Sequence, residues 1–118
     1  MNKSSELHVI HILECIERIY LFTQGNKDLF IHDRKTYDAV LRNLQTMAES
    51  AQKLDRNITG KHPSIAWKKI SGFRNFLVHD YLGDINPEQI WVIIEKYLPE
   101  LQDAMRRELP AWKKMIRP

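Results

Sequence analysis

Apolar residues recur at three- and four-residue intervals along most of this chain, which is the spacing of one face of an α-helix. The pattern predicts a first helix over about residues 5–23 and a second over about residues 33–54. Gly25 and Asn26 are stop signals after the first helix, and Asp33 is a suitable cap for the second.

A third helix is predicted from about Ser64 to Gly83, after a loop that contains Gly60 and Pro63. One side of its helical projection is apolar and is expected in the core. The residues on that side are Ala66, Ile70, Phe73, Phe76 and Leu77.

The fourth helix is predicted to begin at Asn86 and Pro87, because asparagine caps helices and proline fits their first turn. It should kink or restart at Pro99 and end at Pro110. Four amphipathic helices with short links predict an all-α fold, packed as an antiparallel four-helix-type bundle.

The composition agrees with one small helical domain. The 118 residues include only 4 glycines and 5 prolines, too few for a turn-rich β fold. We expect a helical domain over residues 1–109 and a short basic tail over residues 110–118. Cys15 is the single cysteine, so no disulfide forms within the chain. No signal pattern or apolar run of membrane length is present, which predicts a reduced, cytoplasmic protein that does not enter a membrane.

Charge is distributed unevenly around the third helix. Between Arg56 and His79 the chain has no acid, although it has 15 acidic residues in total. The basic residues of this window are Arg56, Lys61, Lys68, Lys69 and Arg74. A local positive field suits a polyanion, and Lys68 and Lys69 are the candidates to guide it. A solvated basic face is the simpler alternative.

The same window contains a set of side chains suited to cutting RNA without a metal. Arg74 is a permanent cation that can hold phosphate oxygens, and His79 can exchange a proton near neutral pH. Asn75 lies four residues before His79, so it can orient the imidazole or bind phosphate. In a helical projection these three residues share a broad face with Tyr81.

That face also holds Val78 and Leu82. A surface that mixes apolar and functional polar residues is typical of a contact with a partner. We therefore predict a homodimer in which two copies of the motif share one cleft. The offset of about 140° between Arg74 and His79 also suits a site completed by a second subunit.

The spacing Arg-x4-His-x-Tyr, at Arg74, His79 and Tyr81, resembles the HepT branch of the HEPN family, whose members are toxins of bacterial and archaeal toxin–antitoxin pairs. The resemblance covers most of the chain. It includes segments at residues 33–44, 65–67, 70–72 and 98–101, together with Glu49 and Trp91. Ala48 stands where the family usually has glycine, and Phe73 where methionine is common.

The resemblance implies a HEPN-like helical homodimer that acts as an endoribonuclease with no metal or other cofactor. It also implies an MntA-type nucleotidyltransferase antitoxin that transfers AMP from ATP onto Tyr81. Arg74 would hold the scissile phosphate of a tRNA or an mRNA. His79 would be the base for the ribose 2′-OH or the acid for the leaving oxygen. AMP on Tyr81 would then obstruct the phosphate site and could occupy Arg74.

Other interpretations stay open on the sequence. The chain could be a non-catalytic HEPN-like scaffold that binds nucleotide or RNA and partners a nucleotidyltransferase, since binding needs the same residues as cleavage. A helical DNA-binding regulator is a further alternative, but no helix-turn-helix signal supports it. His8 and His11 have a spacing that suits a metal, yet no third ligand is evident, so they are predicted to pack or face solvent.

Overall fold

The computed structural model describes residues 3–83 and 85–110, and within these residues it contains helices and no strand. The helices are α1 (Lys3–Thr23), α2 (Lys27–His32), α3 (Arg34–Gln52), α4 (Arg56–Thr59), α5 (Trp67–His79), α6 (Pro87–Lys96) and α7 (Leu98–Arg107). The predicted all-α class is confirmed. The predicted basic tail lies outside the described residues except for Pro110. None of the described helices has the length and apolar character needed to cross a membrane.

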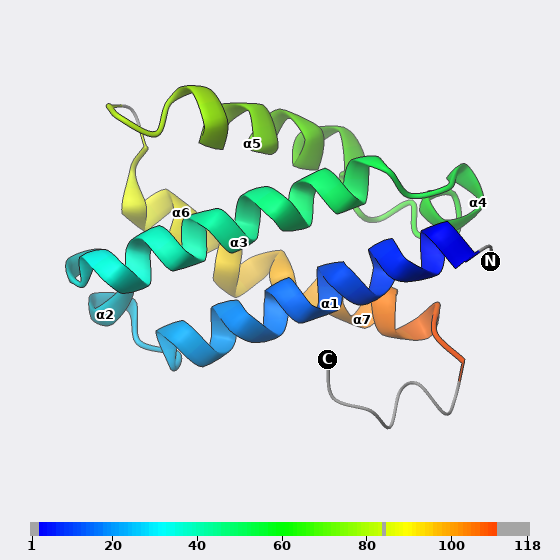
Figure 1. Ribbon diagram of the computed structural model, residues 1–118, viewed down its shortest axis with the longest axis horizontal. Helices are drawn as coiled ribbons and strands as arrows, with labels where there is room; N and C mark the ends of the chain where they lie inside the picture. The colour runs from blue at the N-terminus through cyan, green and yellow to red at the C-terminus, as the bar shows by residue number, and fades with distance from the viewer. Residues whose placement is uncertain (1–2, 84, 111–118) are drawn as a thin grey trace.

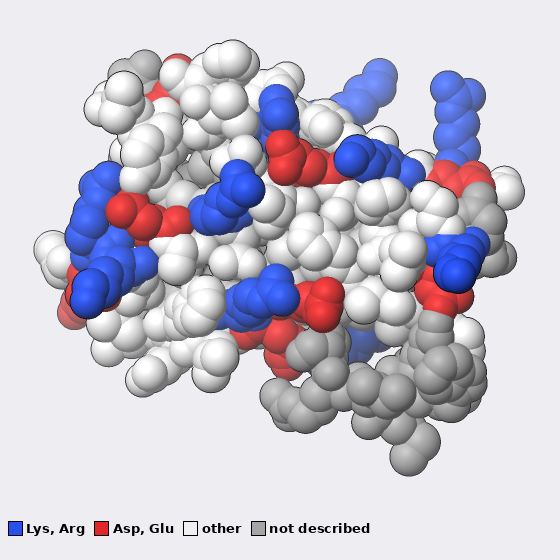
Figure 2. Space-filling view, in the orientation of Figure 1, with Lys and Arg blue, Asp and Glu red and all other residues white. Residues whose placement is uncertain are grey.

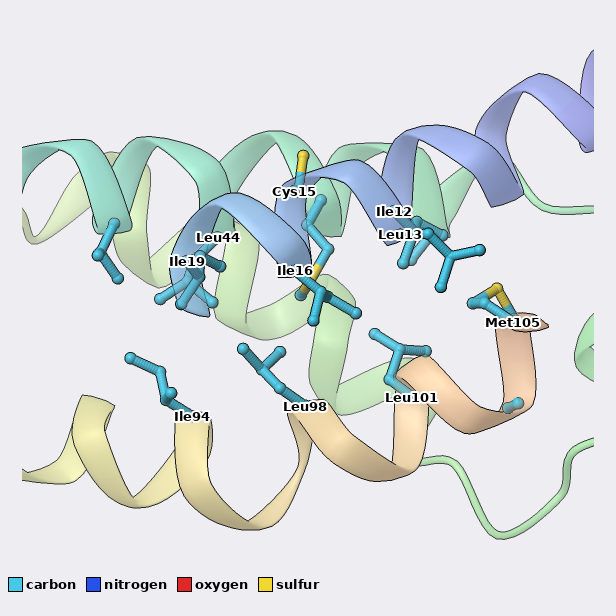
Figure 3. Packing of buried hydrophobic residues seen from close by; sticks show 14 of the residues in the cluster. Ile12, Leu13, Cys15, Ile16, Ile19, Leu44, Ile94, Leu98, Leu101 and Met105 are labelled. Carbon is cyan, nitrogen blue, oxygen red and sulfur yellow. The ribbon is translucent and has the colours of Figure 1, made fainter. Parts of the chain in front are cut away.

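The longer helices lie side by side. In Figure 1, α1 and α3 run along each other in opposite directions, and α5 lies on the far side of α3 from α1. The consecutive helices α6 and α7 pack against α2 and α1 respectively. Figure 3 shows side chains of α1, such as Ile16 and Ile19, facing Ile94, Leu98 and Leu101 of α6 and α7. All five are buried, so the core lies between these helices.

Several helix boundaries follow the cap signals in the sequence. The Asp33 carboxylate accepts a hydrogen bond from the Thr36 backbone N–H at 3.0 Å and caps α3, as predicted. Asn86 caps α6 in the same way. The predicted break near Pro99 is confirmed, because α6 ends at Lys96 and α7 begins at Leu98.

Two short helices were not expected. Asn26, interpreted as part of a stop signal, is also the N-cap of α2, and its side chain accepts a hydrogen bond from the Leu29 N–H at 3.0 Å. The chain turns into α2 through Gln24 and Gly25, which both have positive φ angles. The predicted loop after α3 contains α4, which Asp55 caps. Four- to six-residue helices are too short to produce a clear periodic pattern.

Helix α5 differs most from its prediction. It begins at Trp67 and ends at His79, so the expected extension to Gly83 is wrong. Of its predicted core residues only Leu77 is buried, Ala66 is exposed, and the others are half-buried. The cause is one-sided packing, since α5 packs mainly against α3. Its other side borders an apolar groove of about 280 Å³, which α6 and α7 line from across the gap.

Candidate active site

Helix α5 carries Arg74, which is anchored to the neighbouring helix α3. Its Nε and Nη2 groups donate hydrogen bonds to the same carboxylate oxygen of Glu49, at 3.3 and 3.0 Å. The Arg74 and Glu49 side chains are 31% and 33% exposed, so the pair lies at the surface with its outer side open to solvent. Glu49 therefore fixes the guanidinium group and neutralises part of its charge.

Asn75 accepts a hydrogen bond from Nη1 of Arg74 at 3.3 Å. Among the described residues, three of the five guanidinium N–H groups have partners, and the other two can contact an anion. The position of Asn75 beside Arg74 fits the phosphate-binding alternative better than the orienting one. Within the described residues, no hydrogen bond joins Asn75 to His79.

His79 is the last residue of α5, and its side chain is exposed. No hydrogen bond or ion pair joins the imidazole to another part of the chain that the structure describes. Within that part of the chain, both ring nitrogens are therefore open to an incoming molecule. The helix places His79 five residues after Arg74, which corresponds to a rise of about 7.5 Å along the axis.

Tyr81 lies two residues beyond the end of α5 and turns back toward α3. Its hydroxyl donates a hydrogen bond to the carboxylate of Asp38 and accepts one from Nη2 of Arg34 at 2.7 Å. The Arg34 guanidinium carbon also lies 5.6 Å from the centre of the Tyr81 ring. The cation beside the tyrosine hydroxyl is therefore Arg34, and not Arg74 as the helical projection suggested.

The two ends of the motif contact different parts of α3. Asp38, which holds Tyr81, precedes Glu49, which holds Arg74, by eleven residues, or roughly 16 Å along a helix. The helical projection failed for Tyr81 because it assumed that α5 continues to residue 83. The chain instead leaves the helix after His79 in a turn, in which the Gly83 N–H donates to the Asp80 carbonyl.

The protonation states around Tyr81 follow from these contacts. The hydrogen bond to the Asp38 carboxylate, together with some burial, raises the pKa of Tyr81 above its ordinary value. The charge of Asp38 likewise raises the pKa of Arg34. At neutral pH the Tyr81 phenol is therefore neutral and the Arg34 guanidinium is charged.

Lys68 and Lys69 are exposed near the start of α5, and Lys69 also borders the apolar groove. Figure 2 shows basic side chains projecting from the upper edge of the molecule, while acidic and basic groups alternate over the rest of that face. The window without acids in the sequence is not free of acids in space, because Glu49 comes from another helix to contact Arg74. The local positive charge is smaller than the sequence suggested.

Three residues of the site were not identified from the sequence as functional: Arg34, Asp38 and Glu49. They lie within about 60° of each other in a helical projection of α3, on the side that contacts α5 and Tyr81. This alignment was the available signal. It was not sufficient because an arginine and an aspartate four residues apart also form ordinary surface pairs.

His11, near the start of the chain, has a structural explanation. Nδ1 of His11 lies 2.6 Å from the Ser50 hydroxyl, and its Nε2 lies 3.5 Å from the Cys15 sulfur. Within residues 3–83 and 85–110, no group of three or more metal-ligating side chains is placed to hold an ion. Cys15 is buried, as predicted, and burial raises the pKa of its thiol.

Comparisons with known proteins cover the helices that form this site. The chain matches the model of a family described as ribonuclease HepT-like over residues 12–108. It is 37% identical over 99 residues to a candidate RNase of Methanocaldococcus jannaschii, which covers 83% of this chain and 81% of that protein. A candidate RNase of Caldanaerobacter subterraneus is 31% identical over 108 residues, with 91% of this chain and 96% of that protein covered. A protein of Thermococcus cleftensis named probable ribonuclease HepT is 29% identical over 108 residues, with 91% and 97% covered. The comparison with solved structures gave no match.

Proposed function

This chain belongs to the HepT-like ribonuclease family, and from that premise we propose that it is an endoribonuclease that needs no metal ion. One observation carries the proposal. A fixed guanidinium group, with two N–H groups that no described residue occupies, lies on the same helix as an exposed imidazole, five residues away. These are the two functions that RNA cleavage by internal attack requires, an anion-binding group and a proton-transfer group.

The proposed reaction uses the ribose 2′-OH of the substrate as nucleophile. Arg74 binds the scissile phosphate through its two free N–H groups and stabilises the charge that develops on it. His79 takes the proton from the 2′-OH, the 2′ oxygen attacks phosphorus, and the bond to the 5′ oxygen breaks. The histidine of a second subunit supplies a proton to that leaving oxygen. Lys68 and Lys69 attract the RNA, a tRNA or an mRNA, and Asn75 adds a phosphate contact.

We place the second subunit at the outer side of α5. Val78 is 39% exposed there, next to the exposed His79, and Leu82, which is 97% exposed, follows in the turn beyond the helix. Apolar side chains this exposed favour burial against a partner. In the proposed homodimer, the helices of each copy form an antiparallel bundle, and the two motifs face one cleft. The dimer acts in the cytoplasm.

The regulation that we propose makes the chain the toxin of a toxin–antitoxin pair. A nucleotidyltransferase antitoxin of the MntA type transfers AMP from ATP onto the Tyr81 hydroxyl and stops cleavage. Tyr81 is 36% exposed, so a second protein can reach it. It is also two residues from His79, so an added nucleotide would occupy space at the proton-transfer group.

The nuclease proposal is tested by incubating the purified protein with cellular RNA in the presence of a chelator and measuring cleavage. The parent protein is compared with Arg74→Ala and His79→Ala. Both variants should lose cleavage by at least about a hundredfold, because each removes one of the two required groups. His8→Ala on α1 is the matched control and should cleave normally, since α1 packs mainly against α3 and α7.

Binding measurements separate the proposal from its main alternative. If the parent binds RNA or nucleotide without cutting it, and His79→Ala binds equally well, the non-catalytic scaffold is the better explanation. If chelation abolishes cleavage by the parent, the metal-free mechanism is wrong.

A further inference from the structure

The hydroxyl of Tyr81 is part of a closed set of polar contacts with two residues of α3. The O–H group donates to the Asp38 carboxylate, and Arg34 Nη2 donates to the same hydroxyl oxygen at 2.7 Å. Nε of Arg34 also lies 3.1 Å from the Asp38 carboxylate. The hydroxyl proton is therefore directed at a carboxylate, and a cation lies beside the oxygen.

Stability is a weak explanation for this arrangement. The Arg34 and Asp38 side chains are 70% and 45% exposed, and an exposed ion pair typically contributes at most about 1 kcal/mol. Tyr81 itself is at the surface, beyond the last turn of α5. Its ring and hydroxyl are ordered by contacts that add little to the core, which points to a chemical role for the ordered hydroxyl.

A hollow adjoins the hydroxyl. It has a volume of about 310 Å³, near the lower end of the range for small-molecule sites. Its walls include His32, Arg34, Tyr37, Tyr81 and Ile85. The lining is mixed, with aromatic rings that can stack on a base, polar groups and the Arg34 guanidinium, and this mixture suits a nucleoside that carries a phosphate.

We propose that Asp38, Arg34 and Tyr81 form the acceptor site for nucleotide transfer, with Asp38 as proton acceptor, Arg34 as phosphate ligand and the adjoining hollow as the place of the nucleoside. This inference rests on the proposed modification of Tyr81 and names the residues that perform it on this chain. In the step, the Tyr81 oxygen attacks the α-phosphorus of ATP and forms an O–P bond. The bond from that phosphorus to the pyrophosphate oxygen breaks, pyrophosphate leaves with the electron pair, and the Tyr81 proton passes to Asp38.

The protonation state of Tyr81 explains why a proton acceptor is needed. Its raised pKa keeps the phenol neutral at physiological pH, and a neutral phenol is a poor nucleophile. Asp38 already holds the hydrogen bond along which the proton would move. Arg34 stays charged beside Asp38 and can neutralise the new phosphodiester.

The experiment follows AMP addition over time by intact mass, with the nucleotidyltransferase partner and ATP. Asp38→Asn should slow the addition by about a hundredfold, the lower range for loss of a general base. Arg34→Gln should slow it by roughly tenfold. Asp103→Asn and Arg107→Gln are matched controls, because these residues form a similar exposed pair on α7 at 2.8 Å. Both controls should react at the parent rate.

A pH series distinguishes proton transfer from a structural effect. The ratio of the Asp38→Asn rate to the parent rate should rise with pH, because ionised tyrosine needs no base. The rise should approach tenfold per pH unit below the tyrosine pKa. Besides Asp38, the groups that face Tyr81 are Arg34 and Tyr37 on α3 and His32 on α2 across the hollow. Asp38→Glu restores a carboxylate and should recover part of the rate.

Three other outcomes would contradict the proposed acceptor site. If Asp38→Asn accepts AMP at the parent rate at every pH, Asp38 is not the proton acceptor and the inference is wrong. If Asp38→Asn is slow but the rate ratio does not change with pH, and Asp38→Glu is equally slow, the role is structural and the inference is again wrong. If the parent gains no mass with an active partner while it still cleaves RNA, the modification and this inference fail together, and the nuclease proposal stands.

Discussion

Substitution of Glu49 by glutamine should strengthen RNA binding and weaken catalysis at the same time. The change keeps the shape of the side chain and one acceptor oxygen but removes the negative charge that faces Arg74. A phosphate bound to the free side of the guanidinium group would lie on the order of 6 Å from the Glu49 carboxylate. The two anions repel each other, and Glu49→Gln removes that repulsion.

The size of the effect follows from the exposure of the pair. Two unit charges about 6 Å apart interact by roughly 0.7 kcal/mol in water and by about 2.8 kcal/mol at an effective dielectric constant of about 20. The side chains are 31% and 33% exposed, which places the site between these limits. A repulsion of about 1–2 kcal/mol corresponds to RNA binding about 5- to 30-fold tighter in the variant.

The turnover rate should fall in the same variant, because a neutral amide holds the guanidinium group less firmly than a carboxylate does. Steady-state cleavage of a short labelled RNA at low salt measures both effects, as a lower KM and a lower kcat. Glu95→Gln is the control, since Glu95 is an exposed acid on α6, which packs mainly against α7 and α2. A KM for Glu49→Gln that is unchanged or higher would refute the reasoning, because it would mean that the scissile phosphate does not meet Arg74.

Three stability and reactivity predictions follow from buried groups. Leu77→Ala should lower the free energy of unfolding by roughly 2–3 kcal/mol in urea, since Leu77 is the one buried residue of α5. His62→Ala should lower the free energy of unfolding by about 1–3 kcal/mol, because it removes a 2.7 Å contact to the Glu108 carboxylate, which is only 9% exposed. The control Asp103→Ala, which breaks an exposed ion pair, should lower it by less than about 1 kcal/mol. Cys15 should react slowly with a thiol reagent at neutral pH in the native protein and rapidly in denaturant, because burial raises its pKa and blocks access.

Helix boundaries could be predicted from the sequence where they depend on contacts between residues that are close together in the chain. Side chains at Asp33 and Asn86 accept hydrogen bonds from the first turns of α3 and α6, and these signals depend only on neighbours in the chain. The end of α5 was not predictable in this way. Tyr81 leaves the helical path to contact Asp38, 43 residues earlier, and no local pattern encodes that contact.

The same distinction between local and long-range contacts applies to the burial of α5 and to the candidate site. An apolar stripe shows which side of α5 avoids water, but not whether a second helix covers it, so Phe73 was expected in the core and is half-buried beside a groove. Arg74 and His79 could be proposed from the sequence because they lie close together on one helix. Glu49 was not identified as functional, because its contact with Arg74 depends on the relative register of α3 and α5.

Helix α3 supplies the partner residues for both ends of the motif, and this has a consequence for inhibition. Glu49 holds Arg74, while Arg34 and Asp38 hold Tyr81, at positions on α3 that are separated by at least eleven residues, or roughly 16 Å. A nucleotide on Tyr81 would therefore have Arg34 as its nearest cation, and Arg74 would keep its contact with Glu49. His79 does not line the hollow proposed for the nucleoside, but it precedes Tyr81 by only two residues, so any part of the nucleotide that extended from the hollow would lie near His79. The proposed modification would then hinder proton transfer by His79 more directly than phosphate binding by Arg74.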